Sequence, residues 1–177
     1  MTRAVFLDRD GVLNASLVRD GQPFPPATLD ELDILPGVPE ALHKLHHAGF
    51  LLLVCTNQPD IARGKTKLAD VQKIHAHMMQ TLPLDDVFMC PHDGGDGCAC
   101  RKPKPGMIVQ GAEKWGVDPR QSFMVGDRWR DVAAGQAAGC TNYFINYNYN
   151  ESQPQPPFFE VASLLEAADH ILSNPVT

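Results

Sequence analysis

Three short apolar runs, each followed within two residues by polar residues, are the clearest structural pattern in this chain. Residues 4–7 and 50–55 are entirely apolar, and residues 122–125 are apolar after a leading serine. Continuous apolar runs of this length are typical of strands that are buried on both faces, as in a parallel sheet. Because the carboxyl ends of parallel strands meet at one edge of a sheet, we expect the polar residues after these runs to lie close together.

Between and after these runs, apolar residues recur at helical spacing. The pattern predicts helices over residues 39–48, 68–82, 106–115 and 129–138, and a terminal helix from Ser163 to Leu172. Short strands are expected at residues 87–89 and 142–145. Strands alternating with helices predict an α/β fold, a Rossmann-like parallel sheet with helices on both faces. The 177 residues fit one domain, residues 1–177.

Two carboxylates follow the first apolar run. Asp8 and Asp10 lie on the same side of an extended chain, and Gly11 allows a sharp turn behind them. One carboxylate of such a pair can attack phosphorus while the other shuttles a proton, provided that a divalent cation tempers their repulsion. Asp and Gly are also ordinary turn residues after strands, so the pair alone does not decide.

The other strand ends supply what phosphoryl transfer further requires. Thr56 and Asn57 offer hydrogen-bond donors, and Arg101 and Lys102 offer fixed positive charge. Asp127 offers hard oxygen ligands of the kind that Mg²⁺ prefers, and Asp131, four residues later, is expected to orient a metal ligand or water. Together these positions indicate a phosphoryl-transfer site.

A second cluster has the composition of a zinc site. Cys90, His92, Cys98 and Cys100 lie within eleven positions and provide three thiolates and one imidazole. Four N or S ligands are typical of tetrahedral structural zinc, and they leave no position open for catalysis. We therefore expect a structural Zn²⁺ in a loop at about residues 90–100. The alternative is a reduced loop without metal.

The order of these motifs resembles the haloacid dehalogenase-like phosphatases, in the branch of heptose-bisphosphate and histidinol phosphatases. The resemblance covers about residues 3–146. It is carried by residues 8–14 (DRDGVLN), 56–58 (TNQ), 61–64 (IARG), 90–92 (CPH), 98–103 (CACRKP), 106–107 (GM) and 126–127 (GD).

This resemblance implies a Mg²⁺-dependent phosphatase that works through an aspartyl-phosphate. The implied substrate is the 7-phosphate of D-glycero-D-manno-heptose 1,7-bisphosphate, and histidinol phosphate is the alternative substrate. An alternative function of another class is a zinc-stabilised binding module without catalysis. The implied site residues are Asp8 as nucleophile, Asp10 as general acid and base, Thr56 and Lys102 on the phosphoryl group, Asn57, Arg101 and Arg128 on the substrate, and Asp8, Asp127 and the Asp10 carbonyl on Mg²⁺.

The charge balance limits the class of partner. The net charge is −6, and no basic stripe offers the footprint that nucleic acid requires. No apolar run approaches the ~20 residues of a membrane helix, and no secretory signal opens the chain. We expect a cytoplasmic monomer. Positive charge gathers near residues 101–104 and 128–130, which favours a small phosphorylated substrate.

The segments around the expected site leave no room for a large cap domain. Residues 15–36 read as a proline-rich loop that covers the site at most partly. Pro59 and Asp60 stand where related enzymes typically carry Ser-Gly, so Asp60 either adds negative charge near the ligand or caps a local turn. Five histidines outside the cysteine loop, His43, His46, His47, His75 and His77, are expected to be solvated on helix surfaces.

Overall fold

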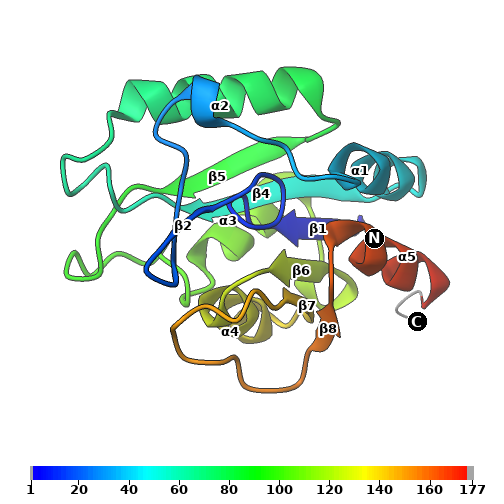
Figure 1. The fold of residues 1–177 in the computed structure, drawn as a ribbon. Helices are drawn as coiled ribbons and strands as arrows, with labels where there is room; N and C mark the ends of the chain where they lie inside the picture. The colour runs from blue at the N-terminus through cyan, green and yellow to red at the C-terminus, as the bar shows by residue number, and fades with distance from the viewer. Residues whose placement is uncertain (1, 175–177) are drawn as a thin grey trace.

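The computed structural model describes residues 2–174 and has a six-stranded parallel sheet at its centre (Figure 1). The strand order is β5-β4-β1-β6-β7-β8. The strands span Ala4–Leu7 (β1), Leu51–Asn57 (β4), Asp86–Cys90 (β5), Phe123–Gly126 (β6), Thr141–Ile145 (β7) and Phe159–Val161 (β8). The three strands predicted to carry the chemistry, β1, β4 and β6, are direct neighbours.

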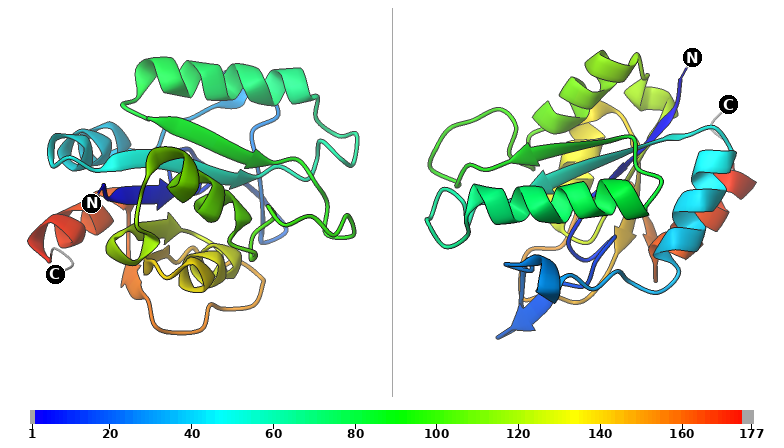
Figure 2. Two further views of the ribbon diagram at one scale, coloured as in Figure 1. Left: turned by 180° about the vertical axis from the view of Figure 1, so that it is seen from behind. Right: turned by 90° about the horizontal axis from the view of Figure 1, so that it is seen from above.

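Helices cover both faces of the sheet (Figure 2). Helices α1 (Val38–His47), α2 (Leu68–Thr81) and α5 (Leu164–Ser173) pack on one face, and α3 (Gly106–Trp115) and α4 (Trp129–Ala138) on the other. The central strand β1 divides its side chains between the two cores: Val5 and Leu7 face α1, while Ala4 and Phe6 face α3. The predicted fold class is confirmed.

Most of the predicted elements agree with the structure to within one or two residues. Helices α3 and α4 have the predicted bounds, and Ser163 caps α5 by accepting a hydrogen bond from the Glu166 amide. Strand β8 was not predicted, because it has three residues, of which only Val161 is buried. Short 3₁₀ turns lie at Leu29–Glu31 and Pro119–Gln121.

Residues 15–36 are not simply a loop, as the sequence suggested. Strands β2 (Leu17–Arg19) and β3 (Gln22–Phe24) form an antiparallel hairpin. Asp20 and Gly21 turn it, with φ of 51° and 72°, which is the pattern of a two-residue Asp-Gly turn. The hairpin stands apart from the main sheet, so it can wall a site without entering the core.

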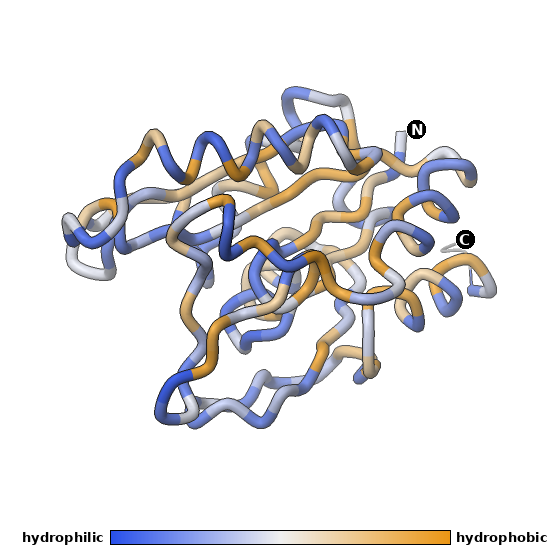
Figure 3. The backbone as a smooth tube through the Cα atoms, turned by 45° about the horizontal axis from the view of Figure 1, so that its top comes forward, coloured by the Kyte–Doolittle hydropathy of each residue, from blue (hydrophilic) through white to orange (hydrophobic). Residues whose placement is uncertain are grey.

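Apolar residues concentrate along the strands, whereas apolar and polar residues alternate along the helices (Figure 3). Within residues 2–174, no helix has both the length and the apolar character needed to cross a membrane.

Candidate active site

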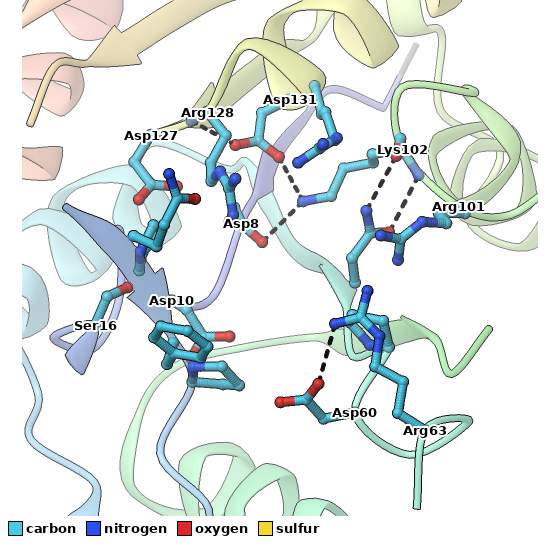
Figure 4. A pocket seen from close by; sticks show the side chains of 17 residues that line it. Asp8, Asp10, Ser16, Asp60, Arg63, Arg101, Lys102, Asp127, Arg128 and Asp131 are labelled. Carbon is cyan, nitrogen blue, oxygen red and sulfur yellow. Dashed lines mark hydrogen bonds and ion pairs between the residues drawn. The ribbon is translucent and has the colours of Figure 1, made fainter. Parts of the chain in front are cut away.

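A cavity of about 330 Å³ opens at the carboxyl ends of β1, β4 and β6 (Figure 4). Strand β3 and the residues that flank the hairpin form one wall, and the segment after β4, the segment before α3 and the start of α4 form the others. The charged residues that line the cavity are Asp8, Asp10, Asp60, Arg63, Arg101, Lys102, Asp127, Arg128, Arg130 and Asp131; Ser16, Gln22, Pro23, Phe24, Pro25, Asn57 and Pro59 complete it.

A buried ion cluster forms the cavity floor. The Lys102 ammonium lies 2.8 Å from Asp8 Oδ1 and 2.6 Å from Asp131 Oδ1, and it also donates to the Cys55 carbonyl at 2.7 Å. Asp8 and Lys102 are 8% and 2% exposed. A lysine so deeply buried must be paired, and here two carboxylates and a carbonyl satisfy its three donors.

Burial and neighbouring charge decide how these groups ionise. Burial, followed by the Asp131 carboxylate, raises the pKa of Asp8 to about 6, against the lowering effect of Lys102. Burial alone would lower the pKa of Lys102, but the Asp131 and Asp8 carboxylates raise it above its ordinary value. Lys102 therefore stays charged at neutral pH, and Asp8 is mostly ionised there.

Asp127 has the features of a metal ligand. It is 1% exposed, and neither carboxylate oxygen has a hydrogen-bond partner of good geometry among the described residues. A Cβ at position 11 would lie 2.0 Å from Asp127 Oδ2, so Gly11 is what lets the backbone pass. Oxygens of Asp8, Asp127 and Asp131 lie within 4.8 Å of one another. Three buried carboxylates, one of them without an ion-pair partner among the described residues, fit a divalent cation such as Mg²⁺.

Asp10 lines the cavity but is held by other contacts. Its carboxylate accepts hydrogen bonds from Asn14 Nδ2 at 3.0 Å and Gln58 Nε2 at 2.8 Å, and from two guanidinium nitrogens of Arg9. Its side chain is 16% exposed. The second carboxylate of the motif is thus fixed from several sides and still reaches the cavity.

The residues predicted at the end of β4 are both close to the site. Asn57 Nδ2 donates to the Lys102 carbonyl and Asn57 Oδ1 accepts from the Lys102 amide, both at 3.1 Å. Thr56 is fully buried, and its Oγ1 accepts from Gln58 Nε2 at 2.9 Å. In the structure Asn57 positions the backbone of Lys102, while contacts of Asn57 and Thr56 with substrate stay predictions.

Arginines gather at the cavity mouth, partly neutralised by acids. Arg128 pairs with Glu151, from the loop after β7, and Arg130 lies 3.8 Å from the same carboxylate. Arg101 also lines the cavity, and its guanidinium donates to the His92 carbonyl at 3.1 Å. The lining holds four arginines and one lysine against five aspartates, so it is mixed in charge, and the basic pocket that the sequence indicated stays a prediction.

Asp60, for which two roles were open, lines the cavity and pairs with Arg63 at 3.2 Å. Arg63 also contacts Asp93 of the cysteine loop at 2.7 Å. Asp60 is therefore ion-paired within the chain, and Arg63, which it shares with Asp93, ties the segment after β4 to the cysteine loop.

The four predicted zinc ligands come together. The Sγ atom of Cys90 lies 3.7 Å from that of Cys98 and 3.1 Å from that of Cys100, and His92 Nδ1 lies 3.3 Å from Cys100 Sγ. Ligands about 2.3 Å from a tetrahedral zinc stand roughly 3.7 Å apart, so the cluster has nearly this size. None of the five cysteines forms a disulfide.

Sequence reasoning was wrong about one histidine and overlooked one arginine. His75 is not solvated: it is partly buried on α2, and its Nε2 lies 3.0 Å from Arg9 Nη1. Arg9 itself is 0% exposed. The signal for His75 was its spacing, since it stands four residues after Val71 and three before Met78, which are both core residues. Arg9 gave a weaker signal, as a charged residue between two carboxylates.

The buried His75 predicts a pH effect on stability. Burial, followed by the charge of Arg9, lowers the pKa of His75 from 6.5 to about 4. Between these values the unfolded chain binds a proton that the folded chain rejects, so the wild type should lose stability as pH falls from 6.5 to 4. Urea unfolding at pH 7 and pH 4.5 should show a smaller loss for His75→Gln. His77→Gln, on the exposed side of α2, is the control, and an equal loss in all three proteins would contradict the prediction.

The haloacid dehalogenase-like hydrolase family model matches residues 16–139. The chain is 40% identical over 146 residues to a D-glycero-beta-D-manno-heptose-1,7-bisphosphate 7-phosphatase of Pseudomonas aeruginosa, covering 79% of each chain. It is 38% identical over 148 residues to the enzyme of the same name from Bordetella bronchiseptica, covering 81% of this chain and 80% of that one. The crystal structure of D,D-heptose 1,7-bisphosphate phosphatase from B. bronchiseptica, complexed with magnesium and phosphate, superimposes with a TM-score of 0.85 at 33% identity, over 98% of this chain and 99% of the other. With these similarities and the carboxylate-lysine cluster at the ends of β1, β4 and β6, the chain belongs to the haloacid dehalogenase-like hydrolase family.

Proposed function

We propose that this protein is a Mg²⁺-dependent phosphatase that removes the 7-phosphate of D-glycero-D-manno-heptose 1,7-bisphosphate. The observation that carries the reaction is the position of Asp8: its carboxylate lies on the cavity floor, 2.8 Å from the Lys102 ammonium and beside Asp127 and Asp131. The substrate is supported by the relatives, which carry this activity in their names.

Two carboxylates divide the work of the reaction. A carboxylate oxygen of Asp8 attacks phosphorus while the bond to the sugar oxygen breaks, and Asp10 donates its proton to that oxygen. Water then attacks the aspartyl-phosphate, and Asp10 takes the proton of this water as phosphate departs. Lys102 holds positive charge against the phosphoryl oxygens throughout, assisted by the Thr56 hydroxyl and Arg101.

Asp8, Asp127 and the Asp10 carbonyl would hold Mg²⁺, and Asp131 supports the site through Lys102. The Asp127 carboxylate supports this assignment: Tyr149 lies near it as a hydrogen-bond donor, but no ion pair joins it to a cation among residues 2–174, and a carboxylate without a counter-ion is costly to bury. When bound, the ion withdraws charge from the phosphoryl oxygens and offsets the repulsion between the carboxylates.

The mouth of the cavity favours a substrate with a second anionic group. Arg101, Arg128 and Arg130 all line it, and Phe24 with its flanking prolines offers an apolar wall for a sugar ring. The second phosphate of a bisphosphate suits these arginines. Histidinol phosphate would instead bring an amine cation toward the arginines, which disfavours it.

A panel of phosphate esters tests the proposal. Phosphate release should be fastest from heptose 1,7-bisphosphate, require Mg²⁺, and exceed that from histidinol phosphate at equal concentration. A higher rate with histidinol phosphate would reverse the order of the two substrates. Binding of esters without release under Mg²⁺ would favour the binding-module alternative.

We also propose that the cysteine loop holds one structural Zn²⁺. All four donors lie within 4.8 Å of one another, and the loop leads directly into Arg101 and Lys102. A metal that fixes the loop would therefore fix the two cations that serve the phosphoryl group.

Metal content should follow the four ligands. We expect one tightly bound zinc per chain in protein prepared without chelator. Cys98→Ser should lose this zinc and should unfold at a lower temperature, because zinc binding stabilises the folded chain relative to the unfolded one. Cys140→Ala removes a buried thiol from outside the cluster and should keep its zinc. Plasma emission spectrometry measures the content; zinc-free wild-type protein, or equal zinc in both variants, would rule out the site.

A further inference from the structure

Asp10 is attached to helix α2 through a buried arginine. The guanidinium of Arg9 contacts both carboxylate oxygens of Asp10: Nε lies 3.1 Å and Nη2 2.9 Å from Oδ1, and Nη2 lies 3.1 Å from Oδ2. On its other side, Nη1 lies 3.0 Å from His75 Nε2. The planar guanidinium is therefore held by the His75 ring on one side, and on the other side it fixes the plane of the Asp10 carboxylate.

The chemistry of the contact fixes the state of the histidine. An arginine only donates hydrogen bonds, so His75 Nε2 must accept, and the ring is neutral with its proton on Nδ1. The low pKa of His75, caused by burial and then by the charge of Arg9, agrees with a neutral ring. Arg9 is 0% exposed, so in the folded chain its Nη1 depends on the ring of His75 for an acceptor.

We infer that His75, acting through Arg9, is a positioning residue that sets the orientation of Asp10 for proton transfer to the leaving group. This inference rests on the proposed phosphatase function and adds to it a residue on α2, a helix that contributes no residue to the cavity lining. Without the ring, one N–H of the buried guanidinium has no acceptor, and Arg9 must shift to find one. A shift of the proton donor by about 1 Å can cost up to 10²-fold in rate.

The dependence on the leaving group separates positioning of Asp10 from a general loss of structure. A sugar oxygen must gain a proton as it departs, whereas p-nitrophenolate leaves readily without one. The ratio kcat/KM includes only the steps up to departure of the leaving group, so hydrolysis of the aspartyl-phosphate does not enter it. His75→Leu should lower kcat/KM about tenfold for the best sugar phosphate and less than about threefold for p-nitrophenyl phosphate.

Three further variants complete the test. His75→Gln can place an acceptor near the position of Nε2 and should restore the sugar phosphate rate, whereas His75→Asn is too short and should show the selective loss. Asp10→Asn should mask His75→Leu, so that the double variant is no slower than Asp10→Asn alone. His77→Leu, two residues along α2 and exposed, is the matched control and should behave as wild type.

The outcomes distinguish this inference from the proposed function. An equal loss for both substrates in His75→Leu and His75→Asn, or a loss for neither, would overturn the positioning role while leaving the phosphatase intact. If His75→Leu does not fold, the comparison of His75→Gln with His75→Asn decides. Wild-type protein that hydrolyses neither ester under Mg²⁺ would instead contradict the proposed function.

Discussion

Asp8→Asn is expected to abolish turnover while leaving the fold intact. The amide cannot form the aspartyl-phosphate, so phosphate release should fall by about 10⁴-fold or more under Mg²⁺. Asparagine has the size of aspartate and lacks its charge. Because burial raises the pKa of Asp8 to about 6, its ionised form costs stability at pH 7, and the neutral variant should unfold no more easily than the metal-free wild type.

A covalent readout makes this prediction specific. Acid quenching of wild-type protein during turnover of a ³²P-labelled ester should leave label on the polypeptide, and Asp8→Asn should carry none. Asp30→Asn, a surface carboxylate on the turn after the hairpin, should match the wild type in both measurements. Label retained in Asp8→Asn would mean that another residue is the nucleophile.

The parts of the site that follow strands could be predicted from the sequence. A buried parallel strand has a simple signature, and the position just after it has a fixed place at the edge of the sheet. For this reason Asp8, Thr56 and Asp127 could be grouped from the apolar runs that precede them, although they are separated by long stretches of chain. Their distances could not be predicted, because the 2.8 Å contact between Lys102 and Asp8 depends on the path of the cysteine loop.

The parts that depend on side-chain pairing across loops could not be predicted. The charge of Arg128 was visible, but its partner Glu151 lies in a loop without periodicity, so nothing in the local pattern joins the two. The hairpin was a failure of another kind. Asp20-Gly21 is a strong turn signal, but the prolines around it indicated a loop, and the short strands β2 and β3 lack a buried apolar alternation.

His75 shows a limit of pattern reasoning within a correctly predicted helix. The periodicity of α2 identified Val71, Ile74 and Met78 as core residues, and all three are buried. A histidine on the edge of that face was assigned to solvent because of its polarity. What the sequence lacked was the partner, since Arg9 lies 66 positions away and points to α2 only in the folded chain.

Lys102→Met is expected to have the second large effect, on both stability and rate. The substitution keeps most of the side-chain volume and removes the charge that lies 2.8 Å from Asp8 and 2.6 Å from Asp131. Removing one partner of a buried ion pair costs roughly 3–5 kcal/mol, because the remaining charge stays buried without compensation. The loss of positive charge at the phosphoryl oxygens should also lower kcat by about 10²- to 10³-fold.

The pH dependence of Lys102→Met separates this electrostatic effect from poor packing. Without the ammonium, the repulsion among the buried carboxylates falls only when Asp8 and Asp127, whose pKa values are already raised by burial, take up protons or when a cation binds. Metal-free Lys102→Met should therefore approach the stability of the wild type as pH falls from 8 to 5, and Mg²⁺ should stabilise it at pH 8. Lys114→Met breaks a surface pair with Asp86, worth at most about 1 kcal/mol, and should show neither effect. A stability difference that is constant over this pH range would mean that Lys102 acts through packing. The electrostatic role proposed for Lys102 in phosphoryl transfer would then be contradicted.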